Sequence, residues 1–258
     1  MDRPLILVSN DDGISAPGIR ALIDVVREIG DVVVVAPDGP QSGMGHAITL
    51  NSTLRCDQIH IDDGPQIEYE CSGTPVDCVK LAMSTILERK PDLCVSGINH
   101  GSNSSINVIY SGTMSAAVEG ALEEIPSIGF SLLDYDNNAD FSEAEPYIRN
   151  ITKKVLEQGL DTGICLNVNI PKSIKGEQLK GLMVCRQANA NWEEEFEARI
   201  DPKGRKYYWL TGKFVNYDQG TDTDEWALTN HYISVVPVQF DVTAHSSLSS
   251  VNKLFLDE

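Results

Sequence analysis

Apolar and polar positions form alternating blocks along the first half of the chain. Leu5–Val8 is an uninterrupted apolar run, which is typical of a central parallel strand covered on both faces. After a polar loop, apolar residues recur at helical spacing between Pro17, which favours a helix start, and Gly30, which favours a helix end. Val32–Val35 then predicts a second buried strand.

The same strand–helix pattern repeats further along. Thr74-Pro75 is a cap followed by a first-turn proline, and an apolar helical stripe comes after it. Leu93–Val95 predicts a third strand, Thr113–Glu124 a helix of small residues and Ile128–Phe130 another short strand. This alternation predicts a Rossmann-like α/β fold with a doubly wound, mostly parallel sheet.

The pattern changes after about residue 175. The predicted elements are a hairpin of Glu195–Asp201 and Arg205–Thr211, a strand at Tyr232–Val238 and a terminal helix at Ser246–Leu256. We expect residues 1–175 to form the α/β core and residues 176–258 a β-rich arm, a returning strand and the terminal helix, all within one domain. The aromatic run Tyr207–Trp209 would either contact another subunit or fold back on its own core.

The charge of the chain excludes some partners. The formal net charge is −18, with a pI near 4.6, and there is no long basic run. Nucleic acids are held mainly by clustered Lys and Arg, so we do not expect a nucleic-acid polymer as partner. The chain shows no signal-peptide pattern and no apolar run of membrane-spanning length, and its six cysteines lack CxxC spacing. We therefore expect a cytoplasmic protein with reduced thiols and no membrane partner.

Candidate metal ligands follow the predicted strands, where ligands gather in open α/β sheets. Asp11 and Asp12 lie in the loop after the first strand, and adjacent carboxylates repel each other unless a proton or a cation neutralises them. Such hard oxygen ligands suit Mg²⁺ or Mn²⁺, although a solvated turn would also explain Asp-Asp-Gly. Asn99, in the loop predicted at residues 96–103, would add a neutral oxygen to a metal shell.

Candidate anion-binding groups lie in two other loops. Residues 36–46 are rich in glycine and include Ser42, so this backbone could approach an anion closely. No dinucleotide fingerprint or Walker A motif is present, and His46 is either a catalytic acid or a surface or packing residue. Ser111–Thr113 precedes a predicted helix, where free amides suit a phosphate and where an N-cap alone would also favour Ser. A cation beside an anion cradle predicts phosphoryl-transfer or hydrolytic chemistry.

These loops lie within sequence blocks that resemble the SurE family of stationary-phase survival nucleotidases. In chain order the blocks are Ile6–Gly13, Ala16–Ile19, Ala36–Asp38, Gln41–Gly43, Ile48–Thr49, Ser72–Cys78, Val95–Asn103, Ile109–Leu122, Thr223–Asp224, Ile233–Val235 and Asp241–His245. They span most of the chain. His231 and Val236 stand where the family usually has glycine and threonine, and residues 187–222 match least well, which leaves specificity and assembly open.

The resemblance implies a metal-dependent phosphohydrolase that removes phosphate from nucleoside 5′- and 3′-monophosphates, with exopolyphosphatase activity in some members. It implies one divalent cation per subunit, Mg²⁺ or Mn²⁺, and a homodimer or homotetramer. The implied metal ligands are Asp11, Asp12, Ser42 and Asn99, and the first two are the expected catalytic pair. The expected substrate-binding and phosphate-binding residues are Asn10, Ser42, Gly43, Asn99, Asn103, Ser111, Gly112 and Thr113. A non-catalytic nucleotide sensor on the same fold is the alternative function. A covalent phospho-aspartate is disfavoured, because enzymes of that kind use Asp-x-Asp spacing.

Overall fold

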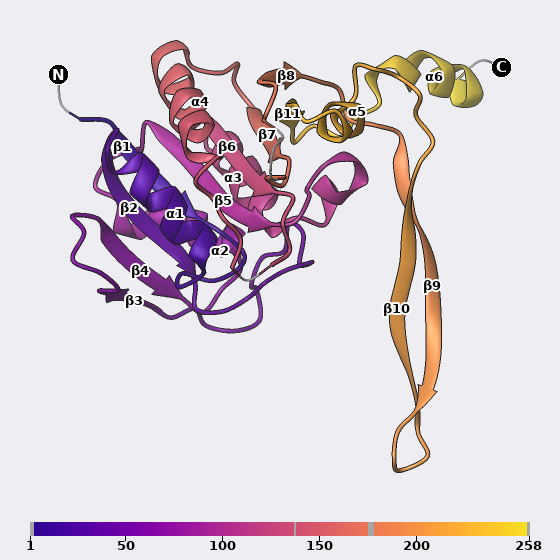
Figure 1. Cartoon of the computed structure of the whole chain (residues 1–258), viewed down its shortest axis with the longest axis horizontal. Coiled ribbons are helices and arrows are strands. Elements are labelled where there is room, and N and C mark those ends of the chain that lie inside the picture. Colours follow the sequence, from indigo (N-terminus) through magenta and orange to yellow (C-terminus); the bar gives the residue numbers. More distant parts are fainter. Residues whose placement is uncertain (1–2, 137, 175–177, 257–258) are drawn as a thin grey trace.

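The structure, a computed structural model, describes residues 3–136, 138–174 and 178–256. Within these ranges it shows a nine-stranded sheet between two layers of helices, with a two-stranded hairpin projecting from the body (Figure 1). The strands are β1 (Leu5–Ser9), β2 (Asp31–Pro37), β3 (Cys56–Ile59), β4 (Ile67–Cys71), β5 (Leu93–His100), β6 (Ser127–Leu132), β7 (Ile164–Ile170), β8 (Leu182–Val184), β9 (Ala190–Ile200), β10 (Lys206–Asn216) and β11 (Ile233–Gln239). The α-helices are α1 (Pro17–Val26), α2 (Pro75–Leu81), α3 (Gly112–Leu122), α4 (Glu145–Gln158), α5 (Asp224–Thr229) and α6 (Leu248–Leu256). The predicted α/β fold class is confirmed.

The strand order places a switch point at the centre of the sheet. β1 pairs in parallel with β2 on one side and with β5 on the other. From β1 the chain runs outward through β2 and β4, and then crosses over to β5, β6 and β7. β11 pairs antiparallel with β7, and β8 lies parallel beside β11. The loops after β1 and β5 therefore meet where the strand order reverses, which is where open α/β sheets bind ligands.

Both faces of the sheet are covered, which explains the continuous apolar run in the first strand. Ile6 and Val8 of β1 join the core beneath α1 and α4, whereas Leu7 joins the core beneath α2. α3 lies beside α2 on this second face, against β5 and β6. No helix within the described ranges has both the length and the apolar character needed to cross a membrane.

The predicted helix starts are confirmed, and one predicted loop is wrong. Thr74 caps α2 by accepting a hydrogen bond from the backbone N–H of Asp77, whose carboxylate accepts from the N–H of Thr74. The loop predicted at residues 96–103 is strand up to His100, because β5 resumes its pairing with β6 after an irregularity between Ser96 and Asn99. Such a bulge interrupts the apolar pattern without ending the strand.

The arm, which is the β9–β10 hairpin, projects away from the sheet (Figure 1). Its strands pair antiparallel from Ala190 opposite Asn216 to Ile200 opposite Lys206, so the predicted hairpin is confirmed and is longer than expected. Tyr207–Trp209 are exposed in the chain, and the alternative in which they fold back on their own core is therefore wrong.

Candidate functional site

Asp11 lies where three parts of the chain converge. It follows β1 directly, and its side chain is only 3% exposed. The hydroxyl of Thr113, in the first turn of α3, donates a hydrogen bond to Asp11 Oδ1. The backbone N–H of Gln41, in the loop after β2, donates to the carbonyl of Asp11 over 2.7 Å. A Cβ at Gly112 would lie 2.6 Å from the Cβ of Asp11, so glycine is required for this close approach of the helix.

The two adjacent carboxylates, Asp11 and Asp12, both have raised pKa values. Burial raises the pKa of Asp11 to about 6, although the hydrogen bond from Thr113 acts in the opposite direction, and the charge of Asp12 adds to the rise. Burial also raises the pKa of Asp12, although the backbone hydrogen bond from His100 and the charge interaction with its imidazole act in the opposite direction. Within the described ranges, neither carboxylate forms an ion pair with Lys, Arg or His. A buried pair of this kind favours a bound cation, because uncompensated charge is costly away from water.

Oxygen atoms near the two carboxylates could complete the shell of a hard cation. Asn10 donates through Nδ2 to the carbonyl of Gly13, while its buried Oδ1 has no hydrogen-bond partner among the described residues. Asn99 donates through Nδ2 to the carbonyl of Gly101, and the next residue, His100, donates its backbone N–H to Asp12 Oδ2 at 3.4 Å. The described residues contain no cluster of three or more His, Cys, Asp or Glu side chains suited to a metal. A cation here would therefore be held by Asp11 and Asp12 together with neutral oxygens and water, as Mg²⁺ often is.

The N-terminus of α3, the candidate anion-binding group, lies beside this pair. Ser111 caps the helix by accepting a hydrogen bond from the N–H of Met114 at 3.0 Å. The N–H groups of Gly112 and Thr113 lie in the first turn, where an α-helix offers no acceptor, and the helix dipole adds positive potential there. The N-cap and the anion cradle proposed for this segment are thus compatible.

Ser42 lies next to a residue that contacts Asp11, whereas His46 contacts Glu119. Ser42 is exposed, and its loop is held to Asp11 through the neighbouring Gln41. His46 Nε2 lies 2.8 Å from Oε2 of Glu119, whose other carboxylate oxygen pairs with Lys80 at 2.5 Å. Glu119 lies six residues after Thr113, about 9 Å further along the helix. This geometry gives His46 a role in holding its loop against α3.

Asn103 lies in a network of buried amides. Its backbone N–H donates to Oδ1 of Asn169 over 2.8 Å, and its Nδ2 donates to the hydroxyl of Ser131 over 2.9 Å. Asn167 donates to the carbonyl of Asn103, also over 2.8 Å. The network ties the loop after β5 to β6 and β7. Sequence reasoning missed Asn167 and Asn169, although their alternation on an otherwise apolar strand is a usable signal.

The chain resembles proteins of the SurE family in sequence and in fold. A family model described as Survival protein SurE matches residues 6–194. A protein named 5′-nucleotidase SurE from Flavobacterium psychrophilum is 66% identical over 258 residues, which cover the whole of both chains. A protein of the same name from Christiangramia forsetii is 65% identical over 257 residues, covering 99% of this chain and 98% of that one. The crystal structure of the SurE protein from Aquifex aeolicus is 40% identical and superposes with a TM-score of 0.82, covering 97% of this chain and 99% of that one.

Proposed function

Since the chain belongs to the SurE family, we propose that it is a 5′-nucleotidase, a phosphohydrolase acting on nucleoside 5′-monophosphates. The observation that carries the proposal is the convergence of the buried Asp11–Asp12 pair with the N-terminus of α3 at the switch point of the sheet. The carboxylates alone would repel a phosphate, and the helix amides alone would bind one without activating water. Together they suit phosphate hydrolysis.

The proposed activity depends on one Mg²⁺ or Mn²⁺ per subunit. Asp11, Asp12, Ser42 and Asn99 would hold the cation, because each offers an oxygen atom, the donor that Mg²⁺ and Mn²⁺ favour. A cation bound there would supply positive charge against the substrate phosphate and would make a nearby water more acidic.

The chain's own groups then have distinct tasks. Asp11 is fixed on two sides, by Thr113 and by Gln41, so it suits a rigid metal ligand. Asp12 is less buried and suits orienting the attacking water or accepting its proton. The amides of Gly112 and Thr113 would bind phosphate oxygens, since the Thr113 hydroxyl is already committed to Asp11.

The remaining proposed residues act around this centre. Asn10 and Gly43 lie on the two loops that border the carboxylates, and Ser111 caps the helix that binds the phosphate. Asn103 positions the loop after β5 through its buried amide network.

Three further properties belong to the same proposal. A site whose catalytic groups contact only the terminal phosphate would also accept 3′-monophosphates and short polyphosphate. The exposed aromatic residues of the arm suit assembly into a homodimer or homotetramer. The acidic surface and reduced thiols suit the cytoplasm.

The test is phosphate release from 5′- and 3′-nucleoside monophosphates and short polyphosphate, each with Mg²⁺, with Mn²⁺ and with EDTA. We expect release only with metal. We expect Asp12→Asn to lower kcat by roughly 10²–10⁴-fold, because it removes a charge that both holds the cation and takes a proton. Circular dichroism should show the variant folded, and near-normal turnover of the folded variant at saturating metal would contradict the assignment.

The alternative is a nucleotide sensor on the same fold. It predicts that titration calorimetry detects nucleotide binding while no phosphate is released under any metal. The unpaired carboxylates disfavour it, because a sensor has no need of a buried, uncompensated pair beside its phosphate site.

A further inference from the structure

A hollow of about 550 Å³ lies at the root of the arm. It is lined by Gly43, Tyr110, Trp192, Leu210, Thr211 and Gly212. Gly43 is the residue after Ser42, and Tyr110 immediately precedes the Ser111 cap of α3. The hollow therefore borders the proposed phosphate site, and its volume lies within the range of small-molecule pockets.

Two aromatic rings dominate its lining. Trp192 is 40% exposed and Tyr110 is 49% exposed, so both rings are accessible to a ligand. Trp192 is held in place, because its Nε1 donates to Oδ1 of Asn107 at 2.8 Å and its ring packs edge-on against Phe214 with centroids 5.5 Å apart. A fixed, exposed indole is a ready stacking surface.

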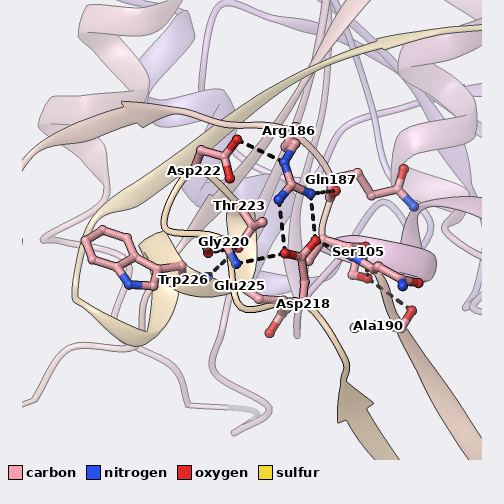
Figure 2. A network of polar contacts seen from close by, with 12 residues as sticks. Ser105, Arg186, Gln187, Ala190, Asp218, Gly220, Asp222, Thr223, Glu225 and Trp226 are labelled. Atoms are coloured by element: carbon pink, nitrogen blue, oxygen red, sulfur yellow. Dashed lines mark hydrogen bonds and ion pairs between the residues drawn. The ribbon is translucent and has the colours of Figure 1, made fainter.

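The root of the arm is anchored to the segment that carries Tyr110. The hydroxyl of Ser105 bonds to the carbonyl of Ala188 at 2.9 Å and to that of Ala190 at 3.2 Å. Figure 2 shows Ser105 beside Ala190, with Arg186 between Asp218 and Asp222. Arg186 thus joins the chain entering β9 to the chain leaving β10. Because both ends of the arm are tied down, the hollow is preformed.

We propose that this hollow binds the nucleobase of a nucleoside monophosphate, with Trp192 and Tyr110 as its stacking surfaces. The proposal rests on the proposed function, which places the phosphate at the adjoining N-terminus of α3. None of the described lining residues carries a charged side chain, and an uncharged base is not repelled by the net negative charge of the protein.

The polar groups of the lining add little base selectivity. The indole N–H of Trp192 is already committed to Asn107, and the hydroxyl of Thr211 already donates to the carbonyl of Glu195. Among the described lining residues, the Tyr110 hydroxyl is therefore the main side-chain group left to distinguish one base from another. Stacking depends on ring area and not on a hydrogen-bond pattern, so purines should bind more tightly than pyrimidines and each purine about equally.

The experiment compares AMP with ribose 5-phosphate, which has the same phosphate and sugar but no base. The readout is the ratio of the KM for ribose 5-phosphate to the KM for AMP, measured in the full chain and in Trp192→Ala, Trp192→Phe and Tyr110→Leu. Removing a stacking ring should raise the KM for AMP by roughly 5- to 100-fold and collapse the ratio toward one. Trp192→Phe keeps an aromatic ring and should retain most of the wild-type ratio. Trp209→Ala removes the same side chain from the same hairpin outside the hollow, and should leave the ratio as in wild type.

Equilibrium dialysis of adenosine separates this proposal from the proposed function, since adenosine has no phosphate to release. Binding by wild type that is lost in Trp192→Ala and in Tyr110→Leu supports the subsite even if no phosphate is released from any substrate. Equal KM changes for AMP and ribose 5-phosphate, or adenosine binding that is unchanged in both variants, would overturn it. Tyr110→Leu lies outside the arm and keeps the test open if Trp192→Ala does not fold.

Discussion

Thr113 is the side chain that joins α3 to the carboxylate of Asp11. Thr113→Val keeps the shape of the side chain and removes the hydroxyl donor, which leaves a buried carboxylate with one hydrogen bond fewer. Since hydrogen bonds to charged groups contribute about 1.5–3 kcal/mol, we expect the free energy of unfolding at pH 8 in EDTA to fall by that amount. Urea denaturation monitored by circular dichroism measures it.

Thr152→Val is the matched control. The Thr152 hydroxyl is buried on α4 without a hydrogen-bond partner among the described residues, so its removal should leave stability unchanged or slightly raised. Equal destabilisation by the two substitutions would show that Asp11 gains nothing from the Thr113 hydroxyl.

At the residue scale the sequence predicts which loops matter better than what each side chain contacts. The sequence predicts Asp11 as a metal ligand and Thr113 as a phosphate-binding residue. The two side chains form a hydrogen bond, because the carboxyl end of a parallel strand lies beside the N-termini of the helices. The partners of Asn103 and His46 could not be predicted. Asn169 and Glu119 lie 66 and 73 residues away along the chain, and no local pattern encodes such pairs.

Helix α3 is held to the loop carrying Ser42 through Glu119. Burial raises the pKa of Glu119, but the hydrogen bonds from His46 and Lys80 outweigh it, and the net pKa is lowered. The folded protein therefore binds this proton less readily than the unfolded chain does, so the stabilisation by Glu119 is present above the unfolded pKa, about 4.3 for Glu. It is lost as the pH falls through the lower pKa of the folded state.

Replacing Glu119 by Gln tests this balance. The difference in free energy of unfolding between wild type and Glu119→Gln should be largest at pH 6–7 and shrink below about pH 4.3. Urea denaturation across this range measures it, with Glu157→Gln on the exposed side of α4 as the control. A difference independent of pH would mean that the ionised carboxylate makes no contribution to holding the loop.

At the element scale, prediction succeeds where one signal is strong and fails where two compete. Pro17 with a helical apolar stripe and Thr74 with Pro75 located two helices at their first turns. The end of β5 was misplaced because Gly97 and the polar residues after it look like a loop, while the register against β6 resumes at Asn99. Strand pairing with a distant neighbour overrides the local composition there.

The whole molecule exposes apolar side chains at its two extremities. Phe196 of the arm and Leu254, Phe255 and Leu256 of α6 are largely exposed, and α6 buries none of its residues within the chain. A nine-residue helix is too short to be stable in water on its own. We therefore expect α6 to pack against another subunit, which would stabilise the helix and remove these side chains from water.

Phe255→Asp tests this assembly. Phe255 is 75% exposed in the chain, and a symmetric interface would bury one copy from each subunit. The substitution would therefore reduce the free energy of association by about 1.5–3 kcal/mol for each subunit. We expect light scattering to show the dimer or tetramer dissociating at concentrations where the wild-type protein stays assembled. Leu50→Asp is the matched control, since Leu50 is 78% exposed on a loop distant in sequence from α6. If Phe255→Asp keeps the wild-type mass on dilution, α6 lies outside the interface. A wild-type protein that is monomeric would remove the assembly altogether and leave the order of α6 without a cause.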